Sequence, residues 1–501
     1  MNTADAVKNL YNNALTSILY FLIERIEKCI IKNGFQLKFA RLYKNKAEKA
    51  LFYYSNYHKR NPDDIDTVIE FAQFLTDNNL INLSVKICEE VLKDTPYNVS
   101  LLLTMCQNCI KTGEFEKVIE YADKVLEAKA DEQYAYKFKT QAYMYLKNEK
   151  MAAKTAEKTN LSILDADTLS HLREYYFRNK NFNKGILVKN KLHEPDLLKT
   201  DRGMKTFPYY IYKYYEKLWH GENLKGKTLF IFDTFSGNGD YILYARYLPQ
   251  LIKQAGKIII SAPDNFYDLY KLNFPECEVI LETHEEFKGH YDYTYHHELF
   301  LNLQKDLDSF PTPEGYLRAD RKLIEEFSQF SFLSTNKPKI GIFWTSTSGG
   351  DNARSLNTKD IIPIIENSSY QFCALSNAEK DAETKEMLEK YNVIDCAKYI
   401  KNADDTAAIM MNLDLIISTD SFPIHLAGAL GVKAYLMLHK DACWRWFYET
   451  EKTDWYSSVK IFRQTQNGDW ADVIQRISGE LKTQSGNNET QSAGQTSVCR
   501  I

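Results

Sequence analysis

An aspartate, a serine and a histidine follow an apolar run late in the chain. The run 413–417 has the composition of a buried parallel strand, and Asp420 and Ser421 come after it in a polar turn. Pro423 favours the start of a helix whose first turn contains His425. The amides of such a turn and the helix dipole bind anions such as phosphate, and the dipole favours a neutral histidine. The segment therefore predicts a diphosphate site, with a histidine packed in the core as the alternative for His425.

A second polar turn follows the apolar run 228–233. It contains Gly237 and Gly239, which allow close backbone approach, and then Asp240 at the start of a predicted helix over 241–248. Two glycines lack the third member of a dinucleotide-binding fingerprint. An acid in a first helical turn is favoured by the dipole, so Asp240 is either a simple cap or a general base at the mouth of a cleft.

Two further segments contain arginines that could hold a diphosphate. Arg354 lies in a loop rich in glycine and hydroxyl groups, after a strand-like run that contains Trp344. Its planar fork suits a diphosphate, although an ordinary surface arginine is the alternative. Farther along, Trp444 and Trp446 flank Arg445 beyond another strand end. These tryptophans either line a nucleotide or sugar pocket or pack between domains.

Alternating strands and helices must position these residues. From about residue 224, strand-like runs alternate with helical ones, which indicates parallel sheets covered by helices. The runs are 228–233, 257–261, 278–282, 339–345, 370–375, 413–418 and 433–438. The segment 306–338, which contains Pro311 and Pro313, predicts a link between two Rossmann-like halves over 220–335 and 336–482. Ligands of such folds bind at the carboxyl ends of the strands, so a cleft is expected between the halves.

The sequence pattern of the first 200 residues predicts helices, and these residues contain a repeat of 34 residues. Pro62, Pro96 and Ala130 stand 34 apart, and small residues recur at equivalent places within the units. This pattern resembles the tetratricopeptide repeat, with clear units over about 61–165 and degenerate helices on either side as caps. Such arrays bind partner proteins on a concave surface, and a scaffold for the second half of the chain is the alternative.

Two motifs resemble metal sites, but their positions within the repeat explain why they are not predicted as such. Cys106 and Cys109 fall at packed positions of a helix, which predicts buried hydrophobic side chains rather than metal ligands. Asp165 and Asp167 lie in the helical array with no strand before them, which predicts a capping or surface role. We therefore expect no metal.

Composition limits the class of protein. The 501 residues have a net charge of −4, 44% hydrophobic and 26% charged residues, which is ordinary for a globular protein and does not favour nucleic acid as a partner. The nine cysteines lack a metal or disulfide framework, the N-terminus lacks a signal-peptide pattern, and the apolar stretch 15–31 is broken by charges. We expect a cytoplasmic protein without a membrane span, and a disordered polar tail over 483–501.

The order of these motifs resembles bacterial glycosyltransferases related to the lipopolysaccharide heptosyltransferases (glycosyltransferase family 9), in the form fused to tetratricopeptide repeats. The resemblance extends over about residues 219–481. The matching pieces are 219–229, Gly237-Asn238-Gly239-Asp240, 245–249, Trp344, Arg354-Ser355, 414–418, Asp420, 425–431, 444–446, 455–456 and 468–470.

The resemblance implies a GT-B fold and a metal-independent, inverting transfer from a nucleotide sugar. The first half would hold the acceptor and the second half the nucleotide sugar, with Asp240 as base. His425 and Arg354 would stabilise the departing diphosphate. The predicted site contains Asp240, Asp420, Ser421, His425, Arg354, Trp344, Gly237, Gly239, Trp444 and Arg445. Two departures from the family are the segment 421–423 and the loop 345–354.

Three functions remain open from the sequence. The repeats favour a protein acceptor of flagellin or adhesin type, docked by the array. A lipopolysaccharide-core transferase would keep the same chemistry and use the repeats as a scaffold. A repeat scaffold with a degenerate, non-catalytic transferase domain is the third possibility.

Overall fold

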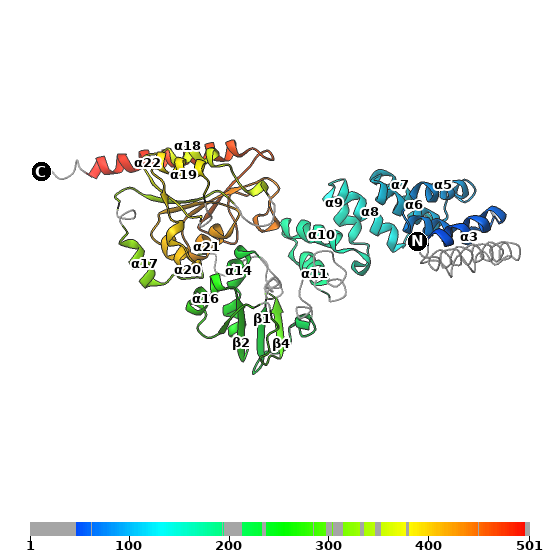
Figure 1. Ribbon diagram of the computed structural model, residues 1–501, viewed down its shortest axis with the longest axis horizontal. Coiled ribbons are helices and arrows are strands. Elements are labelled where there is room, and N and C mark those ends of the chain that lie inside the picture. The colour runs from blue at the N-terminus through cyan, green and yellow to red at the C-terminus, as the bar shows by residue number, and fades with distance from the viewer. Residues whose placement is uncertain are drawn as a thin grey trace, which may run out of the picture. The chain divides into compact units, whose positions relative to one another are not determined.

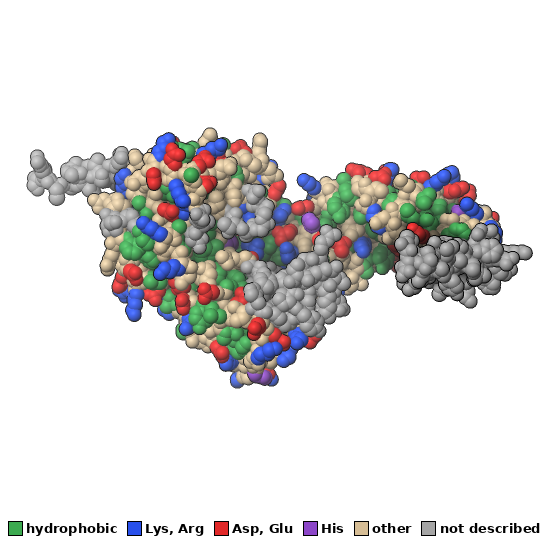
Figure 2. All heavy atoms as spheres, viewed as in Figure 1, with side chains coloured by type: hydrophobic (Ala, Val, Ile, Leu, Met, Phe, Trp, Pro, Cys, Tyr) green, Lys and Arg blue, Asp and Glu red, His purple; other side chains and the backbone are tan. Residues whose placement is uncertain are grey.

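The computed structural model describes residues 47–61, 63–192, 194, 213–232, 237–283, 285–296, 303, 314–330, 335–345, 352–376, 380–448 and 450–495. The chain forms two compact units, Met1–Thr168 and Leu169–Ile501 (Figure 1). The first is helical and the second contains the parallel sheets, which confirms the coarse fold predicted from the sequence. On the face shown in Figure 2, acidic and basic side chains are interspersed. Among the described residues, no helix combines the length and apolar character needed to cross a membrane.

Consecutive helices of the first unit pack in pairs. The helices are α3 (Ala47–Arg60), α4 (Ile65–Asp77), α5 (Ile81–Leu92), α6 (Val99–Thr112), α7 (Phe115–Ala128), α8 (Gln133–Tyr145) and α9 (Glu149–Ala156), followed by the short η1 (Leu161–Ile163). The turns within the pairs α4–α5, α6–α7 and α8–α9 contain Asn79, Gly113 and Lys147, with φ of 60°, 81° and 57°. These positions stand 34 residues apart, so the same left-handed turn recurs in each unit.

The small residues of the repeat lie where the helices of the first unit touch. The equivalent positions Ala72, Cys106 and Thr140 are fully buried, and so are Ser84 and Val118. Burial raises the pKa of the Cys109 thiol to about 11, so this cysteine behaves as a small hydrophobic residue. The predicted burial of the cysteine pair is thus confirmed.

The predicted capping role of Asp165 is also confirmed. Its Oδ1 accepts a hydrogen bond of 2.8 Å from the amide of Thr168, in the first turn of α10 (Ala166–Arg178). Its Oδ2 accepts one from Gln141, at 2.5 Å.

Helix α10 and the next helix, α11 (Phe182–Leu192), belong mainly to the second unit. The prediction placed both in the repeat region up to residue 200, and contact with the α/β core overrides that assignment. Phe177 and Phe182 are buried in the same apolar cluster as Trp444 and Phe447.

Two parallel sheets form the centre of the second unit. The first has the order β3 (Glu278–Leu281), β2 (Lys257–Ala262), β1 (Thr228–Phe232) and β4 (Tyr293–His296). The second has the order β10 (Val459–Arg463), β9 (Ala434–Leu438), β8 (Leu415–Thr419), β5 (Lys339–Phe343), β6 (Gln371–Ala374) and β7 (Ile394–Asp395). All pairings within these sheets are parallel. The prediction found seven of these strands and missed β4, β7 and β10, which lack a long apolar run.

Helices cover the sheets and connect their strands. They are α14 (Asn238–Ala245), α15 (Leu248–Ile252), α16 (Tyr267–Asn273), α17 (Arg321–Ser328), α18 (Ile362–Ile365), α19 (Ala382–Lys390), α20 (Ala403–Met410), α21 (Phe422–Leu430) and α22 (Trp470–Gln495). Short 3-10 turns lie at η3 (Asp264–Phe266), η5 (Asn352–Arg354), η6 (Thr358–Ile361), η7 (Ala397–Tyr399) and η8 (Trp444–Trp446). Helix α14 of the first sheet packs directly on α21 of the second, which brings the two sheets together.

Two predicted boundaries differ from the structure. Helix α17, which the predicted boundary at 335 assigns to the first half, contacts α20, and Asn412 donates a hydrogen bond to the Ile324 carbonyl. The tail predicted to be disordered from residue 483 is helical as far as Gln495, because α22 continues through it. Gln484 anchors this part of the helix by donating a 2.7 Å hydrogen bond to the Tyr435 hydroxyl.

A buried carboxyl group lies where α20 meets α16. Asp404 is 4% exposed, and one of its oxygens has no hydrogen-bond partner among the described residues. Burial, with the negative charges of Asp268 and Asp405, raises its pKa to about 6, although a bond from the Leu269 amide lowers it. At neutral pH the folded chain therefore contains an unfavourable buried charge.

Replacing Asp404 by Asn should stabilise the protein. The folded chain keeps this proton up to about pH 6 and the unfolded chain only up to about pH 3.9, so unfolding free energy falls as pH rises between these values. We expect Asp404→Asn to raise the free energy of unfolding by ~2 kcal/mol at pH 8 and to remove this pH dependence. Urea unfolding of both proteins at several pH values measures it, and equal stability at pH 8 would contradict it.

Candidate active site

A cavity of about 390 Å³ opens at the carboxyl ends of strands from both sheets. Its lining comes from the segments after β1, β2, β5, β6, β7, β8 and β9, together with the N-terminal residues of α20. The lining residues are Gly237, Asn238, Gly239, Asp240, Asn265, Phe343, Arg354, Leu375, Ile400, Asn402, Thr406, Asp420, Ser421, Phe422, Pro423, His425, Cys443 and Arg445. This is the edge at which parallel α/β sheets bind ligands.

The second sheet contributes the N-terminus of α21. Strand β8 is fully buried and ends at Thr419, and α21 begins at Phe422 with Pro423 in its first turn. Ser421 is the N-cap residue, and its side chain makes no capping hydrogen bond. The first turn of α21 therefore presents amides and a positive dipole end to the cavity without a side-chain cap.

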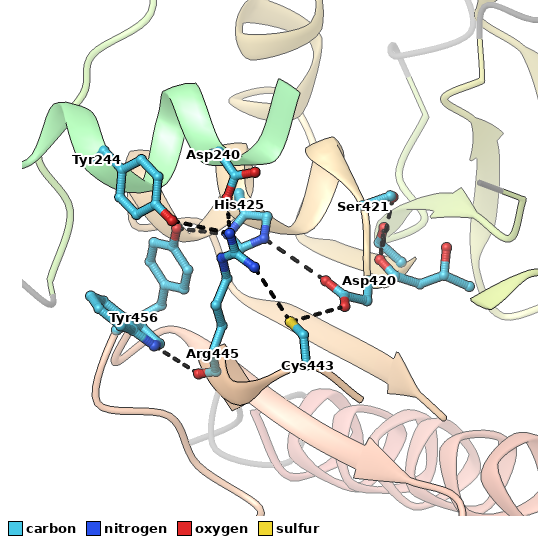
Figure 3. A network of polar contacts seen from close by, with 11 residues as sticks. Asp240, Tyr244, Asp420, Ser421, His425, Cys443, Arg445 and Tyr456 are labelled. Atoms are coloured by element: carbon cyan, nitrogen blue, oxygen red, sulfur yellow. Dashed lines mark hydrogen bonds and ion pairs between the residues drawn. The ribbon is translucent and has the colours of Figure 1, made fainter. Parts of the chain in front are cut away.

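His425 is buried at the cavity wall in its neutral form. Its Nδ1 lies 3.0 Å from the Tyr456 hydroxyl, and its Nε2 lies 3.9 Å from Oδ1 of Asp420 (Figure 3). Burial lowers the pKa of His425 well below its usual value, and the charges of Arg445 and Arg246 lower it further. This direction agrees with the neutral histidine predicted from the sequence, and burial is its largest cause.

The first sheet contributes Asp240, which forms an ion pair with Arg445. Arg445 Nη2 bonds Oδ1 of Asp240 and also lies 3.0 Å from the Tyr244 hydroxyl, while its Nη1 lies 3.6 Å from the Cys443 sulfur (Figure 3). Both side chains of the ion pair are less than one-fifth exposed. A carboxylate from one sheet and a guanidinium from the other thus meet at the cavity in a poorly hydrated ion pair.

Gly239 allows α14 to approach the histidine. A Cβ atom at this position would lie 2.6 Å from Cδ2 of the His425 ring, closer than real contacts permit. A side chain here would push α14 from α21 and displace either Asp240 or His425. The close backbone approach predicted for Gly237 and Gly239 is therefore observed at Gly239, with His425 as its partner, whereas a Cβ atom at Gly237 would make an ordinary contact of 3.5 Å with Asp240 Oδ2.

A second buried arginine stands behind the histidine. The guanidinium carbon of Arg246 lies 4.7 Å, 5.1 Å and 4.9 Å from the ring centres of Tyr316, Trp455 and Tyr456. The aromatic faces stabilise this cation. Arg246 adds positive charge beside the cavity without lining it.

Comparison with known proteins gives limited similarities. No family model matches the chain. The chain is 25% identical over 291 residues to Protein FlbA of Caulobacter vibrioides, and the match covers 53% of this chain and 48% of FlbA. It thus spans about half the length of this curated relative.

Solved structures similar to the chain include both kinds of protein named in the sequence resemblance. A glycosyl transferase family 9 protein from Veillonella parvula is 13% identical and matches with a TM-score of 0.42, over 54% of this chain and all of that one. The ADP-heptose lps heptosyltransferase II of E. coli is 18% identical, with a TM-score of 0.40 over 52% of this chain and 99% of that one. A tetratricopeptide repeat protein from Thermus thermophilus is 14% identical, with a TM-score of 0.28 over 37% of this chain and 99% of that one.

Most of the residues predicted for the site line the cavity. These are Gly237, Gly239, Asp240, Arg354, Asp420, Ser421, His425 and Arg445. The two predicted tryptophans do not. Trp344 is buried in the core against the second sheet, and Trp444 packs on Phe177, with ring centres 4.6 Å apart. For Trp444 the packing alternative is therefore the one observed.

Several cavity residues were not predicted from the sequence. Asn265, Asn402, Thr406 and Cys443 line it, but lone amides and hydroxyls give no spacing pattern to detect. Tyr456 belongs to a segment that matched the family resemblance, yet nothing in the sequence pairs it with His425. In the described ranges, His, Cys, Asp and Glu do not gather in threes that could hold a metal ion, and metal independence stays a prediction.

His425 should remain uncharged where an ordinary histidine titrates. We expect its Cε1 proton resonance, assigned with a His425→Gln variant, to keep one chemical shift between about pH 7.5 and pH 5.5. Because the unfolded chain binds this proton and the folded chain does not, the histidine lowers stability as pH falls through about 6.5. A midpoint near pH 6.5 in the NMR titration would contradict this.

Proposed function

We propose that the chain is a GT-B glycosyltransferase that transfers a sugar, with inversion, from a nucleotide-sugar donor to an acceptor hydroxyl. One observation carries the proposal: Asp240 of the first sheet lies at the same cavity as the α21 N-terminus of the second. The first can accept a proton and the second can bind a diphosphate, which are the two tasks of such a transfer. The sequence resemblance over residues 219–481 supports the same reaction.

The proposed step uses Asp240 as general base. The acceptor hydroxyl loses its proton to the Asp240 carboxylate and attacks the anomeric carbon, while the bond from that carbon to the diphosphate oxygen breaks. The leaving diphosphate takes the negative charge. The α21 amides, Arg445 and Arg354 offer positive charge to it in a poorly hydrated cavity. His425 is neutral, so it contributes a polar ring nitrogen to the cavity and no additional charge.

We propose further that the acceptor is a protein docked by the repeats. A groove of about 710 Å³ in the first unit is lined by side chains of α4, α6 and α8. Gln73, Gln107 and Gln141 stand in it at the repeat spacing of 34, and Gln73 donates a 2.9 Å hydrogen bond to Gln107. The amides offer donors and acceptors to a peptide backbone, beside the rings of Tyr134 and Phe138 and charged side chains of both signs, Glu70, Lys111 and Lys137. A lipopolysaccharide acceptor is the competing possibility.

Replacing Asp240 by Asn should remove the base and keep the shape of the cavity. We expect sugar transfer to fall roughly 10²- to 10⁴-fold, and the melting temperature to fall as well, because the enclosed Arg445 loses its charge partner. Turnover of nucleotide sugars is measured for the variant, and Glu386→Gln on the exposed face of α19 is the control with the same change of charge. Wild-type activity in Asp240→Asn would exclude Asp240 as the base.

Removing the repeats should separate acceptor docking from donor chemistry. Deletion of residues 1–165 leaves α10, α11 and the cavity lining in place. We expect loss of transfer to a protein acceptor and retention of slow hydrolysis of the donor. Radiolabelled donor, with protein and lipid fractions counted separately, distinguishes the acceptors. Label in lipid, or protein transfer that survives the deletion, would contradict the proposed docking.

A further inference from the structure

The turn that carries Arg445 has a strained backbone. The 3-10 turn η8 covers residues 444–446, and the next residue, Phe447, has φ of 48° and ψ of −174°. Bulky side chains rarely occupy positive φ, so this geometry persists only where surrounding contacts enforce it. The turn directs the Arg445 side chain into the cavity toward Asp240 (Figure 3).

Hydrogen bonds hold the backbone of the turn at successive residues. The Trp455 indole donates to the Arg445 carbonyl at 2.7 Å. Arg463 donates to the carbonyls of Trp446 and Phe447 at 2.8 Å and 2.6 Å. These contacts come from the second sheet and the loop before it. These three hydrogen bonds do not involve Trp444, the first residue of the turn.

The α10–α11 hairpin holds that first residue. The amide of Trp444 donates a 3.2 Å hydrogen bond to Oε2 of Glu174, in α10. The ring of Phe177, one helical turn later, lies 4.6 Å from the Trp444 ring. Lys180, in the turn between α10 and α11, lies 4.7 Å above the Phe447 ring. The hairpin therefore contacts both ends of the four-residue turn.

We propose that Glu174 is a positioning residue for Arg445, and that the α10–α11 hairpin is a working part of the active site rather than a terminal repeat. The inference rests on the proposed function. Glu174 does not line the cavity, so it acts through the turn. Loss of its carboxylate removes the acceptor of this hydrogen bond and lets residues 444–447 relax from the geometry that presents Arg445. The guanidinium then meets a diphosphate less often in the productive orientation.

The test measures binding of inorganic pyrophosphate by calorimetry on the full chain. Glu174→Met keeps the length of the side chain and removes the acceptor, and we expect it to weaken pyrophosphate binding about tenfold. Glu174→Gln keeps an acceptor oxygen and should bind within about threefold of wild type. Glu194→Ala, which removes an exposed partner of Lys191 after α11, is the control and should have no effect.

A double-mutant cycle separates positioning from general destabilisation. In an Arg445→Ala background, Glu174→Met should weaken binding no further, because the group it positions is gone. Glu174→Ala serves as a second variant should the methionine prevent folding, and melting temperatures are recorded for all proteins. Wild-type affinity in a folded Glu174 variant, or an effect that adds fully to that of Arg445→Ala, overturns this inference alone. A wild-type chain that neither binds pyrophosphate nor turns over a nucleotide sugar overturns the proposed function as well.

Discussion

The close contact of α14 with α21 determines the arrangement of the candidate site. These helices follow β1 and β8, so their packing brings the carboxyl ends of both sheets to a common cavity. Gly239 makes the contact possible, because a Cβ atom there would overlap the His425 ring. Asp240 is the next residue, and its reach to Arg445 depends on the same approach. A glycine on one helix and a histidine on the other thus set the separation of the groups that would do chemistry.

Burial of the side chains determines the charge states at this site. Arg246 and Arg445 are both enclosed, and Arg445 forms an ion pair with Asp240 at the cavity. The faces of three aromatic rings stabilise the positive charge of Arg246. Burial lowers the pKa of His425, and the two nearby cations lower it further. The local balance is therefore positive although the chain has a net charge of −4, and this suits an anionic leaving group.

The sequence predicts those parts of the structure that depend on local pattern. Ala72, Cys106 and Thr140 revealed the repeats because close helix packing selects small residues at a regular spacing. The cavity residues that follow β1, β8 and β9 could be found because ligands bind where parallel strands end. Contacts between distant segments could not be predicted in this way. Trp444 and Trp344 resemble binding residues, yet both are core, and the polar end of α22 is helical because Tyr435 and Glu480 anchor it.

The turn at Phe447 explains why the domain boundary predicted from the sequence pattern differs from the boundary that the contacts in the structure define. A non-glycine residue at positive φ costs about 1–3 kcal/mol, which local sequence alone would not sustain. Arg463 and Trp455 hold the turn from the second sheet, and Glu174 holds it from a helix more than two hundred residues earlier. Since the strain is opposed from both sides, separating the hairpin from the sheet would release it and allow Arg445 to leave its place. The hairpin therefore belongs with the sheets in the unit that contains the cavity, and the repeat array ends before α10.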